Sequence, residues 1–323
     1  MRPAYSVILL TTLIGAGQGL FLALFSTDVA GRLGFHPAPG SAFIVAGTGL
    51  ALALLGAGLV ASFFHLGRPE RAWRSASQWR TSWLSREVII LPAFGLAALA
   101  YGLARFVAGP APASAPGLAI DATLVAGATA SAFAIALYVC TGMIYACLRF
   151  LREWHSPLTV LNYGLMGFAS GTTLAAVLAG WGEPALARPV TAWALGATLA
   201  AFAGRAASLL RNARLRPVST AQTAIGVKHP RIRQVSQGFT AGSFNTHEFF
   251  HGRAPGILRH VKGFFLACAF AVPAALLAAS LAGAPPLAVV AACLVQSAGL
   301  LAERWFFFAE ANHPQNLYYQ AVA

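Results

Sequence analysis

Eight long apolar stretches, separated by polar segments, run along this chain. Each has the roughly 20 residues that a helix needs to cross about 30 Å of hydrocarbon. We predict transmembrane helices at 5–25, 42–64, 88–107, 118–138, 157–180, 191–209, 263–281 and 287–308. The first stretch is too long for the apolar part of a signal peptide and lacks a convincing cleavage site, so we assign it to the mature protein. The fold class is an all-α integral membrane protein, with residues 1–323 forming one polytopic bundle.

The composition supports this prediction. Hydrophobic residues make up 58% of the chain and charged residues only 10%, and the mean hydropathy is +0.67. A soluble domain carries roughly 25% charged residues, so this chain cannot cover a water-facing surface. The composition therefore excludes an ordinary soluble enzyme.

The basic residues give the predicted bundle an orientation. If the eight helices alternate in direction, all but three of the 22 Lys and Arg lie on the side of Met1; the exceptions are Arg32, Arg105 and Arg188. Short loops rich in Lys and Arg stay in the cytoplasm. We therefore expect a multi-pass protein of the bacterial cytoplasmic (inner) membrane, with both termini and the basic face in the cytoplasm.

One segment of the basic face, 211–262, is long and carries interleaved aromatic residues. Long ordered loops are usually functional, so we favour a docking surface for a protein partner over simple contact with anionic lipid. Nucleic-acid binding is disfavoured because no recognisable reading module is present. The residues that we expect to bind the partner are Arg71, Arg74, Arg149, Arg152, Arg231, Arg233, His247 and Arg253.

The chain offers no redox centre of its own. Its four cysteines form no CxxC pair, so we expect no iron–sulfur or zinc site and favour buried, inert thiols. A transmembrane haem needs two axial histidines at matching depth, and every histidine lies at or beyond a predicted helix end. We predict that this chain binds no haem, iron–sulfur cluster or molybdenum.

The polar residues expected at mid-membrane depth are Gln18 and Gln296, with Asp121 near the outer start of the fourth helix. No helix carries a carboxylate at its centre, and no internal repeat is visible. Both observations disfavour a small-anion transporter, which remains a remote alternative. Two GxxxG pairs, at 15–19 and 167–171, predict close helix packing.

The segment 65–87 is the candidate for chemistry. His65 follows the apolar pair Phe63 and Phe64 at the predicted membrane boundary, and Arg68 comes shortly after. A quinone head group needs such a place, because its tail comes from lipid while a titratable group and donors serve its oxygens. The residues alone favour an interfacial anchor for His65 and a salt-bridged helix start for Glu87 over a proton relay.

Several motifs carry a resemblance to a known family. They are HLGRP at 65–69, SWLSRE at 82–87, CTGMIY at 140–145, EWHSP at 153–157, FNTHEFFHG at 244–252, AERW at 302–305 and NLYY at 316–319. Together and in this order, the motifs resemble those of the membrane anchor subunits of the dimethyl sulfoxide reductase family. The resemblance runs over nearly the whole chain.

The resemblance implies one subunit of a three-subunit molybdoenzyme, not catalytic toward the soluble substrate. Such anchors bind an iron–sulfur subunit, which binds a molybdopterin catalytic subunit, and they exchange electrons with an exchangeable membrane quinone. A histidine placed like His65 is implicated there in quinol binding, which favours a quinone site of His65, Arg68 and Glu87 over the anchor interpretation.

The predicted cytoplasmic position of the basic face favours one branch of that family. It is similar to the anchors of quinone-linked sulfite dehydrogenases, whose catalytic subunit stays in the cytoplasm, so we favour oxidation of sulfite to sulfate. The alternative is the anchor of a dimethyl sulfoxide reductase that oxidises menaquinol. A third possibility is a purely structural tether whose partner alone binds quinone.

Overall fold

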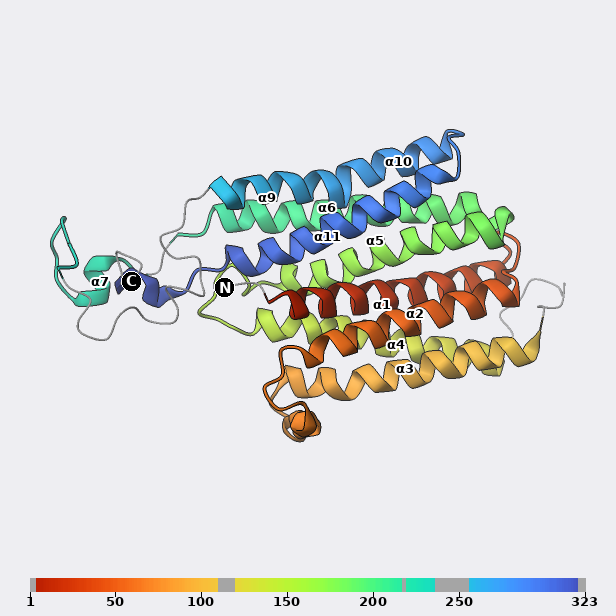
Figure 1. The fold of residues 1–323 in the computed structure, drawn as a ribbon, viewed down its shortest axis with the longest axis horizontal. Coiled ribbons are helices and arrows are strands. Elements are labelled where there is room, and N and C mark those ends of the chain that lie inside the picture. Colours follow the sequence, from red (N-terminus) through yellow and green to blue (C-terminus); the bar gives the residue numbers. More distant parts are fainter. Residues whose placement is uncertain (1–3, 110–119, 217–218, 236–255, 319–323) are drawn as a thin grey trace.

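The computed structural model describes residues 4–109, 120–216, 219–235 and 256–318. Within these ranges eight helices are long and apolar enough to cross a membrane, and they lie along one another in an elongated bundle (Figure 1). Seven are single α-helices: α1 (Tyr5–Arg32), α2 (Ser41–Phe63), α3 (Trp83–Ala108), α4 (Ala122–Ala146), α5 (Pro157–Gly182), α6 (Pro184–Ala213) and α11 (Leu287–Glu310). The eighth runs without a break through α9 (Gly256–Leu266), the π-helical η2 (Ala267–Ala271) and α10 (Val272–Leu281). The predicted all-α fold with eight spans is confirmed.

Short elements gather at one end of the bundle. The 3₁₀ helices η1 (Pro69–Gln78) and η3 (Pro314–Tyr318) and the short helix α7 (Ala221–Ile225) lie at the end where α1 begins and α11 finishes (Figure 1). We call this end, with segments 64–82, 147–156, 214–216 and 219–235, the basic end. The loop 33–40 and the turns after α5 and α10 form the opposite end.

Most of the helices extend beyond the predicted spans, but α2 ends at Phe63, one residue before the predicted end, and α4 begins at Ala122, after the predicted start at 118. Helix α3 begins at Trp83 because the Ser82 side chain accepts a hydrogen bond from the backbone N–H of Ser85 at 3.4 Å, capping the first turn. Residues 83–87 of the predicted quinone segment are therefore helical. Likewise the predicted docking segment 211–262 lies partly in helices, since α6 ends at Ala213 and α9 begins at Gly256. Within that segment, residues 217–218 and 236–255 lie outside the described ranges.

Helices α1 and α5 touch through their backbones. A side-chain carbon on Gly19 would overlap the backbone of Gly167, and one on Gly171 would overlap that of Gly19. Only hydrogen fits at such a crossing, which is why small residues mark close helix pairs in lipid. The two GxxxG pairs thus pack against each other, as the prediction of close packing required.

The π-helical turn η2, in the span formed by α9, η2 and α10, packs closely against α11. Gly299 of α11 lies so close to η2 that a side-chain carbon there would overlap the backbone of Ala269. The Gln296 amide donates hydrogen bonds to the Ala269 carbonyl at 3.4 Å and to the Thr198 hydroxyl at 3.1 Å. A π turn disturbs the regular backbone bonding of a helix, and Gln296 supplies a donor at that point. Gln18, the other predicted mid-membrane amide, donates to the Ala134 carbonyl at 2.9 Å.

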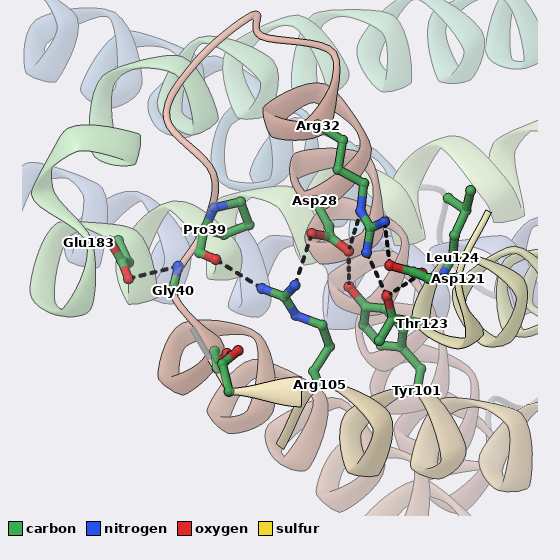
Figure 2. Close-up of polar contacts among 12 residues, drawn as sticks. Asp28, Arg32, Pro39, Gly40, Tyr101, Arg105, Asp121, Thr123, Leu124 and Glu183 are labelled. Atoms are coloured by element: carbon green, nitrogen blue, oxygen red, sulfur yellow. Dashed lines mark hydrogen bonds and ion pairs between the residues drawn. The ribbon is translucent and has the colours of Figure 1, made fainter. Parts of the chain in front are cut away.

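A buried ion network joins helices at the opposite end (Figure 2). The Asp28 carboxylate, 2% exposed, lies 3.6 Å from the Arg105 guanidinium and accepts a 3.1 Å hydrogen bond from the Tyr101 hydroxyl. Arg105 also donates to the Pro39 carbonyl at 2.9 Å. Arg32 pairs with Asp28 at 3.6 Å and with Asp121 at 2.8 Å. The network therefore ties α1, α3 and the start of α4 together.

The arginines of the opposite end are thus structural partners. Arg32 and Arg105 belong to the ion network, and Arg188 donates to the Leu281 carbonyl at 3.0 Å, joining α6 to α10. Asp121 caps α4 by accepting a 2.7 Å hydrogen bond from the Leu124 backbone. Partial burial opposes ionisation of Asp121, but bonds from Arg32, Thr123 and Leu124 outweigh it and hold its pKa well below the usual range.

Candidate functional site

His65 lies at the boundary where α2 ends. Its backbone N–H bonds to the Ser62 carbonyl at 3.3 Å, and the neighbouring side chains of Phe63 and Phe64 are 47% and 83% exposed. Among the described residues, the His65 imidazole forms no hydrogen bond or ion pair. Partial burial lowers the pKa of His65 below its usual value because it disfavours the imidazolium. Within the described part of the chain, both ring nitrogens of His65 are therefore without a partner, next to the exposed rings of Phe63 and Phe64.

Arg68 immediately precedes η1, and three tryptophan–arginine pairs follow it along segment 69–86. Arg68 is exposed, and its guanidinium has no ion-pair partner within the described ranges. Three later arginines lie over tryptophan rings: Arg74 over Trp73 at 5.5 Å, Arg80 over Trp79 at 5.4 Å and Arg86 over Trp83 at 4.2 Å. Cations over indole faces are stabilised by the ring quadrupole. Arg68 is thus left available beside His65 in the sequence.

Glu87 points into the bundle. Its carboxylate accepts a hydrogen bond from the Thr141 hydroxyl of α4, while Arg86 donates to the carbonyls of Trp79 and Arg80 at 2.9 and 2.8 Å. The prediction that Glu87 forms a salt-bridged helix start is therefore wrong, because Arg86 is bonded to the loop. No hydrogen bond or ion pair within the described chain joins Glu87 to His65. The structure does not bring these two predicted site residues together directly.

Glu87 instead reaches a small cavity inside the bundle. Residues from α1, α3, α4, α5 and α11 line it, among them Thr12, Glu87, Thr141, Tyr163 and Arg304. Its volume is about 20 Å³, enough for a single water molecule and too small for a quinone ring. The cavity is therefore not the predicted quinone site, and Glu87 faces the protein interior.

Behind the cavity lies a chain of buried charges that sequence reasoning placed elsewhere. We counted Arg205 and Arg304 among the charges of the basic face, but both are buried inside helices, 2% and 5% exposed. Arg304 lies 3.8 Å over the Tyr163 ring and 3.7 Å from Glu303. Glu303, fully buried, lies 2.8 Å from Arg205, which reaches Glu310 at 3.5 Å. We call Arg304, Glu303, Arg205 and Glu310 the charge ladder.

The ladder had a signal in the sequence. Arg205, Glu303 and Arg304 all fall within the predicted spans 191–209 and 287–308, and charged residues inside membrane spans are costly and commonly functional. Because we counted Arg205 and Arg304 with the loop charges that set the orientation, we did not recognise them as charges buried within the membrane. Asp28 and Thr141 had weaker signals, because nothing local indicates that their partners lie on other helices.

The predicted docking residues fall into three groups. Arg149 and Arg152 line a cleft of about 680 Å³ at the basic end. Arg71 and Arg74 on η1, and Arg231 and Arg233 after α7, are exposed. His247 and Arg253 lie outside the described residues. The cleft also includes Glu153, whose pKa is raised because burial disfavours the carboxylate.

The described residues bring no three His, Cys, Asp or Glu side chains together as a metal site would need. No disulfide joins the cysteines, which are all free. Cys140 is buried and Cys268 and Cys293 are partly buried, but Cys147 is exposed and donates to the Ile144 carbonyl at 3.4 Å. The expectation of buried thiols is therefore wrong for Cys147, which lies where α4 ends.

These features define a polytopic helical membrane protein whose basic end presents a cleft and an open histidine–arginine boundary site. Comparison with known proteins then gives the family. The sequence model of the DMSO reductase anchor subunit (DmsC) matches residues 2–230. The chain is also 52% identical, over the full length of both proteins, to a sulfite dehydrogenase subunit of Allochromatium vinosum. The chain therefore belongs to the DMSO reductase anchor subunit family, as the resemblance predicted.

Proposed function

We propose that this chain is the quinone-reactive membrane anchor of a three-subunit molybdoenzyme that oxidises sulfite to sulfate. The observation that favours sulfite as the substrate is the 52% identity, over the whole chain, to a subunit of a sulfite dehydrogenase. Membership of the anchor family supports a partner iron–sulfur subunit and a partner molybdopterin subunit. The basic end faces the cytoplasm of a bacterial inner membrane, as its excess of Arg and Lys favours.

The net reaction sets what the anchor has to handle. Sulfite, water and quinone give sulfate and quinol, so each quinone receives two electrons and two protons. The electrons come from the molybdopterin subunit through the iron–sulfur subunit. The substrate is oxidised on another polypeptide, and this chain binds the quinone and brings it protons.

The boundary at His65 fits a quinone head group. The exposed rings of Phe63 and Phe64 face the lipid side, where an isoprenoid tail lies, and the unused imidazole nitrogens are available to a carbonyl oxygen. His65 donates a hydrogen bond to one quinone oxygen, and Arg68 offsets negative charge there. Glu87 supplies protons from the interior side.

The basic end fits an acidic partner. Arg149 and Arg152 at the cleft, and Arg231 and Arg233 on the segment after α7, present positive charge away from the bundle. Complementary charge guides association and fixes the orientation of the partner. Docking here places the nearest cluster of the iron–sulfur subunit at the membrane surface.

The second candidate is the anchor of a sulfoxide reductase, in which the same residues oxidise menaquinol and release protons. The family model that matches residues 2–230 is that of a DMSO reductase anchor, which favours this candidate. The two functions differ in the direction of electron flow. Membranes that hold the complete complex distinguish them by sulfite-dependent quinone reduction and by quinol-dependent reduction of dimethyl sulfoxide.

The test of the quinone site is His65→Ala in the assembled complex. We expect quinone-dependent sulfite oxidation to fall by about 100-fold, a loss typical of removing a proton-handling group. Sulfite oxidation with ferricyanide, which takes electrons from the soluble subunits, should remain. His36→Ala, at the opposite end, is the matched control. Wild-type quinone turnover in His65→Ala would reject the site, and labelling of the partner alone by a photoreactive quinone would support a passive tether.

A further inference from the structure

The cavity beside Glu87 has the features of a water site. The Thr12 hydroxyl on its wall is buried and meets no hydrogen-bond partner within the described chain, while the Tyr163 hydroxyl on the same wall interacts with Tyr145. Tyr163 is only 3% exposed. Buried hydroxyls in native proteins are almost always satisfied by protein or by ordered water, and about 20 Å³ holds one water. A water here reaches Glu87 and Arg304, which share the same wall.

From that cavity, a series of ion-paired side chains leads toward the basic end. Arg304 lies on the cavity wall, 3.7 Å from Glu303, and the ladder runs on through Arg205 to Glu310. Asn212 then donates to Glu310 at 3.1 Å, and Asn212 itself lines the cleft at the basic end. The series therefore connects the water-sized space beside Glu87 to the cleft at the basic end.

The carboxylates of the ladder alternate with guanidinium groups. Both Glu303 oxygens are ion-paired, but neither makes a hydrogen bond of proper geometry to the described residues. Glu310 keeps 16% side-chain exposure at the outer step. A guanidinium keeps its own proton in proteins, so Arg205 and Arg304 balance the charge while the carboxylates and water exchange protons.

We propose that protons consumed at the quinone site cross the interior of the bundle, from the cleft through Glu310 and Glu303 to the cavity water and Glu87. This inference rests on the proposed function. For each quinone reduced, two electrons come from the iron–sulfur subunit and two protons enter along this route, one after the other. Glu87 releases each proton toward the quinone and regains one from the water. In a quinol-oxidising complex the same route carries protons outward.

The first test is Glu310→Gln in the assembled complex, since glutamine keeps the shape and can still accept from Asn212. We expect quinone-dependent turnover to fall about 100-fold, with an increased solvent deuterium isotope effect, while ferricyanide-dependent turnover stays at the wild-type rate. Glu183→Gln is the matched control, because that carboxylate accepts a 3.0 Å bond from the Gly40 N–H at the opposite end. Wild-type quinone turnover and isotope effect in Glu310→Gln would overturn the proposal.

The second test fills the cavity and leaves every charge in place. A side-chain carbon at Gly15, on the cavity wall, meets only Gly167 Cα at 3.8 Å, an ordinary contact, so Gly15→Ala fits and displaces the water. We expect the same selective loss of quinone turnover and the same isotope effect. Gly164→Ala, which meets nothing within 4 Å, is the control. A Gly15→Ala complex with wild-type quinone turnover would reject the water step.

The two levels of inference fail differently. If wild-type membranes show no quinone-dependent turnover, the proposed function fails and the relay fails with it. If wild-type turnover requires quinone and His65, but Glu310→Gln and Gly15→Ala behave as wild type, then the relay alone is wrong.

Discussion

The ion network at the opposite end allows a quantitative test of how buried charges hold the bundle. Asp28→Asn removes the negative charge facing Arg105, whose side chain is 3% exposed and whose other partner is the neutral Pro39 carbonyl. An uncompensated buried charge costs about 3–5 kcal/mol. Arg32 suffers less, because it retains Asp121 at 2.8 Å. We therefore expect Asp28→Asn to destabilise the protein by about 3–5 kcal/mol, mainly through Arg105.

A double-mutant cycle isolates that cause. Arg105→Met removes the stranded charge and keeps an unbranched apolar stem, so Asp28→Asn/Arg105→Met should lose mainly hydrogen bonds, about 1–3 kcal/mol. The assay is reversible unfolding of the detergent-solubilised protein in mixed micelles containing increasing amounts of SDS. If the double variant is no more stable than Asp28→Asn alone, the stranded-charge explanation is wrong.

Two further predictions concern the glycine crossing and the boundary histidine. Gly171→Ala should destabilise the bundle by about 1–3 kcal/mol, because the added methyl group overlaps the backbone of α1. Gly180→Ala, which meets nothing within 4 Å, should leave the stability unchanged. Equal unfolding midpoints of the two variants in the same assay would contradict this prediction. His65 should titrate below the usual histidine pKa, since partial burial favours its neutral form, so its contribution to stability is present above pH of about 6.5 and is lost as the pH falls. Selective isotope labelling and NMR measure this midpoint, and a value above the usual one would exclude the described environment.

Apolar length alone was sufficient to predict all eight spans, because a bilayer tolerates little else at that depth. The helix ends were harder to predict. Helix α3 begins at Trp83 because of a single capping serine, and α6 continues to Ala213 past the apolar region. Backbone hydrogen bonds continue beyond the hydrocarbon layer. The length of the apolar stretch therefore underestimates the length of helices such as α3 and α6.

The candidate site was predicted only in part. His65 and Arg68 could be found because they follow an apolar run at a boundary, which is a local pattern. The direction of Glu87 could not, because its partner Thr141 lies on another helix. The ladder also pairs residues far apart in sequence, Arg205 with Glu303 and Glu310. Charge counting treats every arginine as a loop residue and cannot detect such pairs.

The glycine crossing between α1 and α5 also constrains how the protein is made. Gly19 and Gly171 meet at the backbone, so neither helix reaches its final position until both are in the bilayer. Roughly 150 residues separate them, which a ribosome adds in on the order of 10–30 s. During that interval the first helix waits in the lipid with its flat glycine surface uncovered, and this central contact of the bundle closes only after more than half of the chain has been synthesised.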